Sequence, residues 1–417
     1  MRDGRAIILS DYFGGEGAAT GGAGHAVLAS YRALRGIGVD VRVIAGFGAS
    51  PDEQSKRFHS LGGSDLRTGG SAAAVRAIYN PAAKVALHTA LADEDPARTV
   101  IILHQWTRYL SPAAIGALTG FRLMIYMHDY FWACPNGAYY DFRLAQPCTR
   151  MPMGADCLLA DCDRRGRISK FGRVARQAAL LASKPGGAGD RLCLHLSHEA
   201  KATIAPLLPA ERHAVIHNPD TIPATAPVPA EQVRFDVGYF GRLEPEKGVG
   251  LLIDAIDGSS WSGLLVGQGA LEALAGSTPG IEHRAWQPHD RMRSAMRSCR
   301  VVVLPSLWRE TWGLIIPEAM AAGVPVLVSA RAGSAELVHR FGGGAVFDPG
   351  VRGDLEAKLF TLLGSQPATV RDWADFRDHL SARRHAERIV DLATKTWGVD
   401  LRPQDGLSAP PRPAASG

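Results

Sequence analysis

The sequence lacks a long uninterrupted hydrophobic run. Its least charged stretch, 313–330, is about as long as a membrane span, but it contains Pro317, Glu318 and Pro325. Such a stretch fits a short helix followed by a buried strand better than a span. The first residues also lack the apolar run and small-residue cleavage site of a signal peptide. We therefore expect no transmembrane helix and a cytoplasmic protein.

Cysteine is scarce, with 6 in 417 residues. In a cytoplasmic chain of this size, thiols stay reduced or bind metal and do not form a disulfide framework. Four of them fall in one segment, at Cys134, Cys148, Cys157 and Cys162. Their spacing lacks the CxxC pairs of most zinc sites, so a structural zinc ion and unpaired reduced thiols both remain open.

Neither sign of charge dominates. Lys plus Arg number 46 against 41 for Asp plus Glu, and the net charge of +5 does not single out nucleic acid as a partner. The segment 164–184 is a local exception, with seven basic residues, no acidic ones, and Ile168 and Phe171 among them. On a helix it could contact an anionic membrane surface, or it could be a solvated helical face. Its lack of stacking aromatics disfavours RNA.

Short β-rich apolar runs alternate with helical patterns along the chain, which predicts an α/β protein with parallel sheets. A helix should begin near Gly22, after the first strand. The first set of strands is expected at 6–9, 39–45, 99–103, 123–127 and 192–196, and a second set at 237–240, 263–266, 301–304, 324–328 and 344–347. Four prolines between the two sets disfavour regular structure there. The pattern predicts two doubly wound domains that face each other.

These patterns divide the chain into five parts. We expect an N-terminal domain at 1–217, with a cysteine-bearing insert at about 130–165, and a Pro-rich linker at 218–231. A C-terminal domain should follow at 232–365. Helices at 366–400 could pack back on the first domain, and the tail at 401–417 should be disordered.

The segment 304–329, LPSLWRETWGLIIPEAMAAGVPVLVS, carries the strongest functional pattern. A strand ends, a loop carries Glu310, Pro317 fits a first helical position, and Glu318 follows it. A carboxylate can accept hydrogen bonds from two neighbouring hydroxyls of a sugar or ribose. The alternative is that Glu318 only complements the helix dipole and Glu310 is a solvated charge.

A basic pair, Arg242 and Lys247, follows the strand expected at 237–240. A guanidinium and an ammonium suit the two phosphates of a nucleotide diphosphate. The alternative is an exposed pair neutralised by Glu244 and Glu246. Earlier in the chain, glycines from Gly14 to Gly24 lead into the first helix and would allow close approach of an anion. Their spacing is not GxGxxG, so a nicotinamide cofactor is weakly supported, and a plain surface loop is the alternative.

These segments, in this order, resemble the retaining GT-B glycosyltransferases of group 1, or family 4, from about residue 7 to residue 397. Glu310 and Glu318 match the family's E-x7-E motif, and Arg242 and Lys247 stand where its diphosphate-binding pair stands. The resemblance implies a GT-B fold with a cleft between two Rossmann-like domains. It also implies that Glu310 contacts the donor sugar and Glu318 contacts the ribose.

The same resemblance implies further site residues. The amides of Trp312, Gly313 and Leu314 would bind sugar and phosphate, and Gly22 belongs to a loop like the one that approaches the donor phosphate. His128, in YMHDYFWACP, resembles the family's active-site histidine. Its alternative is a structural hydrogen-bonding pair with Asp129.

The resemblance implies transfer of a sugar from a nucleotide diphosphate donor to a glycan or lipid-linked acceptor, with retention, in cell-surface polysaccharide synthesis. No cofactor is expected for catalysis, because Arg242 and Lys247 could neutralise the leaving group without a metal ion. The expected partners are the nucleotide sugar and the acceptor. The protein could also contact the inner face of the membrane peripherally, and no nucleic acid is expected as a partner. The alternatives are a GT-B sugar phosphorylase, a nucleotide-sugar epimerase, or a zinc-bearing nucleic-acid-binding protein.

Overall fold

A computed structural model describes residues 2–14, 21–49, 57–184, 188–220, 222–224, 226–227, 233–287 and 289–402. Part of the glycine-rich loop, including Gly15, Gly17 and Thr20, lies outside the described residues. The same holds for much of the linker expected at 218–231 and for nearly all of the expected tail.

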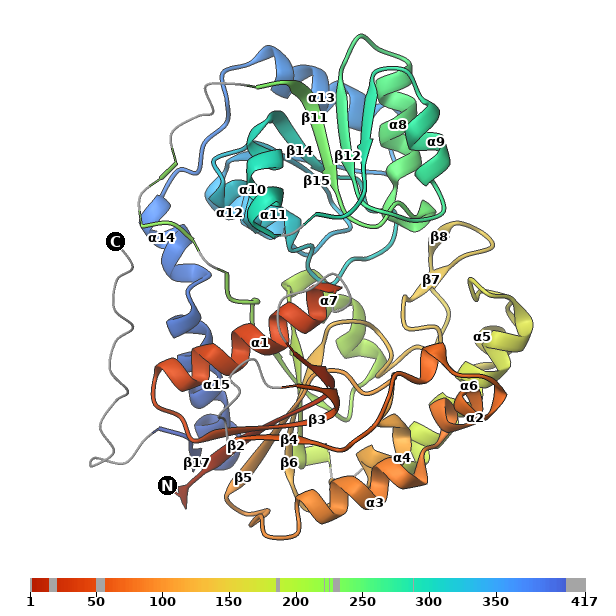
Figure 1. Ribbon diagram of the computed structural model, residues 1–417, viewed down its shortest axis with the longest axis vertical. Helices are drawn as coiled ribbons and strands as arrows, with labels where there is room; N and C mark the ends of the chain where they lie inside the picture. Colours follow the sequence, from red (N-terminus) through yellow and green to blue (C-terminus); the bar gives the residue numbers. More distant parts are fainter. Residues whose placement is uncertain are drawn as a thin grey trace.

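The first sheet is parallel and is built from the amino-terminal half of the chain (Figure 1). Its seven strands follow the spatial order β10-β9-β6-β5-β2-β3-β4. Their bounds are β2 Arg5–Phe13, β3 Val41–Gly48, β4 Phe58–Ser60, β5 Thr99–Leu103, β6 Arg122–Met127, β9 Arg191–His195 and β10 Arg212–Val215. The central strands are buried on both faces, as their continuous apolar sequence predicts. The order reverses between β2 and β5, as in a doubly wound sheet.

Helices flank this sheet and fill the connections between its strands (Figure 1). Their bounds are α1 Gly21–Gly36, η1 Leu66–Thr68, α2 Ser71–Ile78, α3 Pro81–Ala90, α4 Ser111–Gly116, α5 Ala155–Leu159, α6 Arg167–Ser183, η2 Ala188–Asp190, α7 His198–Ile204 and η3 Ala205–Leu207. A small antiparallel pair, β7 Tyr140–Asp141 with β8 Gln146–Pro147, lies in the cysteine-bearing segment.

The second sheet is also parallel, with six strands in the spatial order β13-β12-β11-β14-β15-β16. Their bounds are β11 Phe235–Phe240, β12 Gly263–Val266, β13 Ile281–Arg284, β14 Cys299–Leu304, β15 Val326–Ser329 and β16 Gly344–Phe347. The flanking helices are η4 Pro245–Lys247, α8 Val249–Asp257, α9 Glu272–Ser277, α10 His289–Arg297, α11 Ile315–Ala321, α12 Ala335–Phe341 and α13 Asp354–Gly364. The order reverses between β11 and β14. The predicted α/β class with two doubly wound sheets is confirmed.

The last helices return to the first domain (Figure 1). They are α14 Trp373–His379 and α15 Ala382–Trp397, and β17 Val399–Asp400 then pairs with β1 Arg2–Asp3. Helix α15 packs on α1, where the buried His385 ring bonds the Ser30 hydroxyl at 2.9 Å. Helix α14 instead contacts α12 of the second domain, where the Phe376 and Phe341 rings lie 5.3 Å apart and Arg340 pairs with Asp375 at 2.9 Å. The carboxyl-terminal helices therefore contact both domains.

The sequence patterns missed three of the four edge strands, and predicted only β16. β4, β10 and β13 form sheet edges and read FHS, RHAV and IEHR, without the apolar run of a central strand. Helix α11 begins at Ile315 and not at the expected Pro317, which instead occupies the first turn, where its missing N–H has no partner to lose. Among the described residues, no helix combines the length and apolarity needed to cross a bilayer.

Candidate active site

The predicted donor residues lie where the second sheet reverses its order. Lys247 ends the short turn η4 after β11, and Glu310 lies in the loop after β14, the strand beside it. Ligands of doubly wound sheets bind at this switch point, beyond the carboxyl ends of the strands. Gly248, with φ of +72°, lets the backbone turn there, because a Cβ at this position would lie 1.8 Å from the Pro305 carbonyl oxygen.

Lys247 and Glu310 form an ion pair. Lys247 Nζ lies 2.7 Å from Glu310 Oε1, and the two side chains are only 12% and 13% exposed. The second carboxylate oxygen accepts a hydrogen bond of 2.5 Å from the Ser306 hydroxyl. Burial alone would raise the pKa of Glu310, but the Lys247 ammonium and the Ser306 hydroxyl lower it overall. Glu310 is therefore ionised at neutral pH and held in one place, unlike the solvated charge of the alternative interpretation.

Arg242 lies in a different environment from Lys247. Its side chain is 57% exposed, and its nearest acidic partner is Glu246 at 4.0 Å. The buried Glu246 carboxylate is also bonded by Arg164 of the N-terminal domain, which reaches Glu244 at 3.1 Å as well. Because Arg164 already pairs with both carboxylates, the Arg242 guanidinium lies largely exposed at the rim of the site.

The loop Trp312, Gly313 and Leu314 faces the other domain. Gly313 has φ of +101°, and a Cβ there would lie 2.5 Å from Leu304 Cδ2. Leu314 approaches Gly22 at the start of α1, where an added Cβ would lie 2.8 Å from Leu314 Cδ1. The predicted glycine-rich loop and the predicted donor loop therefore meet across the domain boundary.

Glu318 lies on α11 without a hydrogen bond to its carboxylate among the described residues. Burial, followed by the charge of Asp220, raises the pKa of Glu318 to about 8. Its folded environment therefore favours the neutral carboxyl at pH 7 until a hydrogen-bond donor reaches it.

His128 follows β6 on the opposite domain and bonds to both domains. Its Nε2 lies 2.8 Å from His104 Nδ1, and its carbonyl oxygen accepts a 2.9 Å hydrogen bond from the Thr311 hydroxyl. Burial lowers the pKa of His128 to about 4, so its ring is neutral at pH 7. Asp129 instead bonds the amide of Phe131, so the structural pair of His128 with Asp129 is not what the fold contains.

The four clustered cysteines are all buried in one region of the first domain. Lys170 enters between two of them, with Nζ 3.0 Å from Cys162 Sγ and 3.7 Å from Cys157 Sγ. Cys134 bonds Asn136, and Cys148 lies 3.9 Å from an Arg150 nitrogen. Within the described part of the chain, the thiols do not form a group of ligand atoms within 4.8 Å of one another. The structural zinc ion and the unpaired reduced thiols both remain predictions from the sequence.

The basic segment 164–184 forms helix α6 and the turn before it, with some of its basic side chains buried and others exposed. Helix α6 buries Lys170 and Arg176, while Ile168 and Phe171 are exposed. Arg173 pairs with Asp163 at 3.0 Å. Of the basic residues in this segment, Arg164, Arg165 and Arg167 are exposed.

Sequence patterns missed the small polar residues around the site. Ser197 follows β9 and donates a 3.1 Å hydrogen bond to the Thr311 carbonyl oxygen. Ser334 is fully buried beside Gly313, and its hydroxyl has no partner among the described residues. A buried unpaired hydroxyl next to a donor loop is a candidate ligand contact. A serine carries no sequence signal for such a role, because only tertiary packing orients its hydroxyl.

Two facing doubly wound domains, with polar residues at the opposed strand ends, define the GT-B class of fold. Solved structures agree: sucrose-phosphate synthase from Thermosynechococcus elongatus superposes with a TM-score of 0.62 at 16% identity, over 94% of this chain and 99% of that one. Anabaena HepE, in complex with UDP and glucose, has a TM-score of 0.58 at 17% identity, over 93% and 99%.

Residues 234–365 match the family model described as Glycosyl transferases group 1. This chain is also 28% identical over 215 residues to the D-inositol 3-phosphate glycosyltransferase of Mycolicibacterium vanbaalenii, which is 44% of this chain and 48% of that protein. The chain spans about half or less of the length of the curated relatives it matches. Residues 234–365 are thus similar to a group 1 glycosyl transferase domain, and the chain has a GT-B fold.

Proposed function

We propose that this protein transfers a sugar from a nucleotide diphosphate donor to a glycan or lipid-linked acceptor, with retention of the anomeric configuration. The observation that supports this most directly is the buried Lys247–Glu310 ion pair at the switch point of the second sheet, opposite Gly22 of the first domain. The group 1 domain and the UDP and glucose held by Anabaena HepE support a nucleotide-sugar donor.

The proposed donor site assigns a distinct contact to each charged residue. The donor diphosphate would form an ion pair with Lys247 in place of Glu310. The Arg242 side chain would turn inward from the rim and pair with the same diphosphate. The carboxylate of Glu310, released on one side, would then accept hydrogen bonds from sugar hydroxyls. Glu318 would accept from the ribose hydroxyls, and the amides of Trp312 to Leu314 would donate to sugar and phosphate. Charge that develops on the leaving diphosphate would be stabilised without a metal ion.

Retention would follow from attack on the face that the diphosphate leaves. The acceptor oxygen bonds to the anomeric carbon as the bond to the diphosphate oxygen breaks, and the acceptor proton passes to that phosphate oxygen. The nearby carboxylate, Glu310, is tied to Lys247 and Ser306 and contacts sugar hydroxyls in this scheme, not the anomeric carbon. His128, neutral and a weak base, would hold a sugar hydroxyl and not take the acceptor proton.

The acceptor would enter from the N-terminal domain. It would approach the strand end of β6 that carries His128. Exposed apolar side chains on α5 and α6, at Leu159, Ile168 and Phe171, suit peripheral contact with the inner membrane face, where a lipid-linked acceptor would lie. We place the activity in cell-surface polysaccharide synthesis on this basis.

A donor screen by nucleotide release tests the proposal. Purified protein is given each nucleotide sugar, with a panel of polyprenyl diphosphate oligosaccharides as acceptors, and the product linkage is determined by NMR. Transfer with an unchanged anomeric configuration is expected, with Lys247→Met as the inactive control. Phosphate-dependent cleavage of a glycoside would instead indicate a phosphorylase, and an epimerised donor without transfer would indicate an epimerase.

A further inference from the structure

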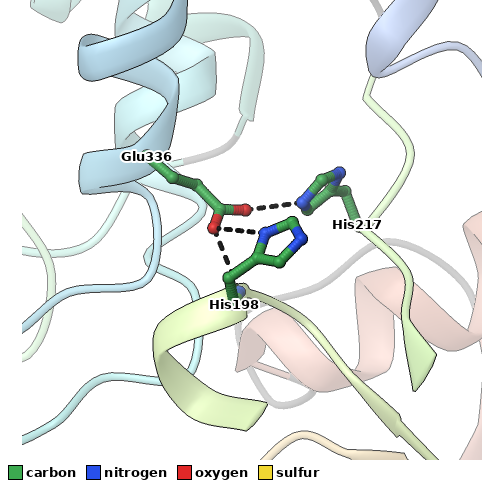
Figure 2. A group of neighbouring side chains, drawn as sticks. All are labelled: His198, His217 and Glu336. Carbon is green, nitrogen blue, oxygen red and sulfur yellow. Dashed lines mark hydrogen bonds and ion pairs between the residues drawn. The ribbon is translucent and has the colours of Figure 1, made fainter. Parts of the chain in front are cut away.

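A second polar cluster lies at the boundary between the domains, apart from the ion pair of the donor site. It contains His198, His217 and Glu336, whose ligand atoms all lie within 4.8 Å of one another (Figure 2). His198 begins α7, His217 follows β10, and Glu336 lies in the first turn of α12 of the second domain. In the described residues, this is the one group of three or more His, Cys, Asp or Glu with such spacing.

The contacts within the cluster are short and directed. Glu336 Oε1 lies 2.5 Å from His217 Nε2, and Glu336 Oε2 lies 3.1 Å from His198 Nδ1. The backbone amide of His198 also donates to Oε2 at 3.0 Å. Figure 2 shows both rings turned toward the carboxylate from the same domain, while the carboxylate approaches from the other. Each residue thus offers a metal-ligand atom within 4.8 Å of the other two.

These distances suit a small divalent ion. Four ligands held at about 2.0–2.1 Å around a tetrahedral ion lie roughly 3.3 Å apart. The two contacts to the carboxylate are 2.5 and 3.1 Å, and all three ligand atoms lie within 4.8 Å of one another, so small side-chain rotations would bring them to this spacing. Two imidazoles with one carboxylate form a ligand set that zinc uses, and a water molecule completes the fourth position. Two nitrogen ligands favour zinc and its neighbours over calcium and magnesium, which prefer oxygen.

The surroundings fix one imidazole and leave an entry route. The His217 ring stacks on Trp312, with centroids 4.9 Å apart and planes 26° from parallel, and the His217 carbonyl oxygen accepts a 2.8 Å hydrogen bond from His385. The side chains of His217 and Glu336 are 15% and 25% exposed, whereas His198 is 76% exposed. An ion can therefore reach a partly assembled site from solvent.

We propose that His198, His217 and Glu336 bind one zinc-class divalent ion that bridges the two domains. The ion links α7 and the end of β10 to α12. It lies next to the donor loop, because the His217 ring stacks on Trp312. Binding therefore favours the arrangement in which the two domains are in contact. The site is separate from the proposed sugar transfer, because none of its three residues has a role in that reaction.

Metal titration of the full-length protein tests the proposal without any donor. After EDTA treatment and desalting, the protein is titrated with Co²⁺, and absorbance separates the two possible classes of ligand. Thiolate ligands give intense charge-transfer bands in the near ultraviolet, whereas a His, His and Glu set gives only weak visible bands. Zn²⁺ is then used to displace Co²⁺ and to obtain the stoichiometry and affinity.

One Co²⁺ per chain without thiolate bands is expected. His198→Ala should weaken the affinity for Co²⁺ by about tenfold to a hundredfold. Glu336→Gln, which keeps the side-chain shape but lacks the charge, should weaken it by a similar factor. His88→Ala, at an exposed position on α3, is the matched control and should bind like the unchanged protein. Zn²⁺ should raise the Tm of the unchanged protein and of the control more than that of the two site variants.

Two results would overturn the proposal. One is binding of equal affinity and stoichiometry in His198→Ala and the unchanged protein. The other is binding with thiolate bands only, or no binding, which would leave the cluster as a hydrogen-bonded contact between domains. Because no donor is present, failure of the sugar-transfer proposal would not produce either result.

Discussion

The Lys247–Glu310 pair permits a test of the site geometry that does not depend on the substrate. With both side chains about one-eighth exposed and 2.7 Å apart, the pair lies between a surface ion pair and a fully buried one. Surface pairs contribute about 0–1 kcal/mol, and breaking a buried pair costs about 3–5 kcal/mol. We therefore expect Lys247→Met to lower the free energy of unfolding by about 2–3 kcal/mol, because the Glu310 carboxylate is left with only Ser306.

The double variant provides the decisive comparison. Glu310→Gln removes the charge that Lys247→Met leaves unpaired, so the double variant should be more stable than the sum of the single effects predicts, by about 1–2 kcal/mol. For domains of this size, a loss of 2–3 kcal/mol lowers the Tm by roughly 4–12 °C. Thermal melts of the four proteins by circular dichroism measure the coupling. Strictly additive Tm changes would refute the ion pair, whatever the enzymatic activity.

Three further predictions address the donor site and the domain boundary. Burial raises the pKa of Glu318 to about 8, so the folded protein keeps this proton between about pH 4.5 and pH 8, where the unfolded chain loses it. The stability of the unchanged protein should therefore fall relative to Glu318→Gln as the pH rises through that window. A Tm difference between the two proteins that is constant from pH 5 to pH 9 would contradict this. Arg242→Ala should lower kcat by roughly 10²-fold, because in the proposed reaction its guanidinium stabilises the charge of the leaving diphosphate. The Tm should change little, because the side chain is exposed. A change in KM alone in steady-state kinetics would argue against that role. Gly333→Ala should lower both kcat and Tm, since its Cβ would lie 2.4 Å from Ser197 Oγ of the other domain; unchanged melts would show that this boundary is looser than described.

The sequence alone was sufficient to predict the central architecture. A parallel strand buried on both faces must be continuously apolar, so β2, β5, β6, β11 and β14 could be recognised from composition. Polar residues could then occur only after the ends of these strands. This placed Arg242, Lys247 and Glu310 near one edge of the second sheet. Edge strands carry no such constraint, because only one of their sides is paired and their faces are partly solvated, so β4, β10 and β13 were missed.

Only the tertiary structure determined which charges are paired and which are buried. Lys247 and Glu310 are 63 residues apart and pair because β11 and β14 are neighbours in the sheet. Lys170, one of four basic residues in helix α6, points inward to Cys157 and Cys162, which no helical periodicity indicates. The cluster around Glu336 forms only when the two domains meet. Such contacts depend on distances across separate elements, whereas the local sequence constrains only the burial and conformation of each element by itself.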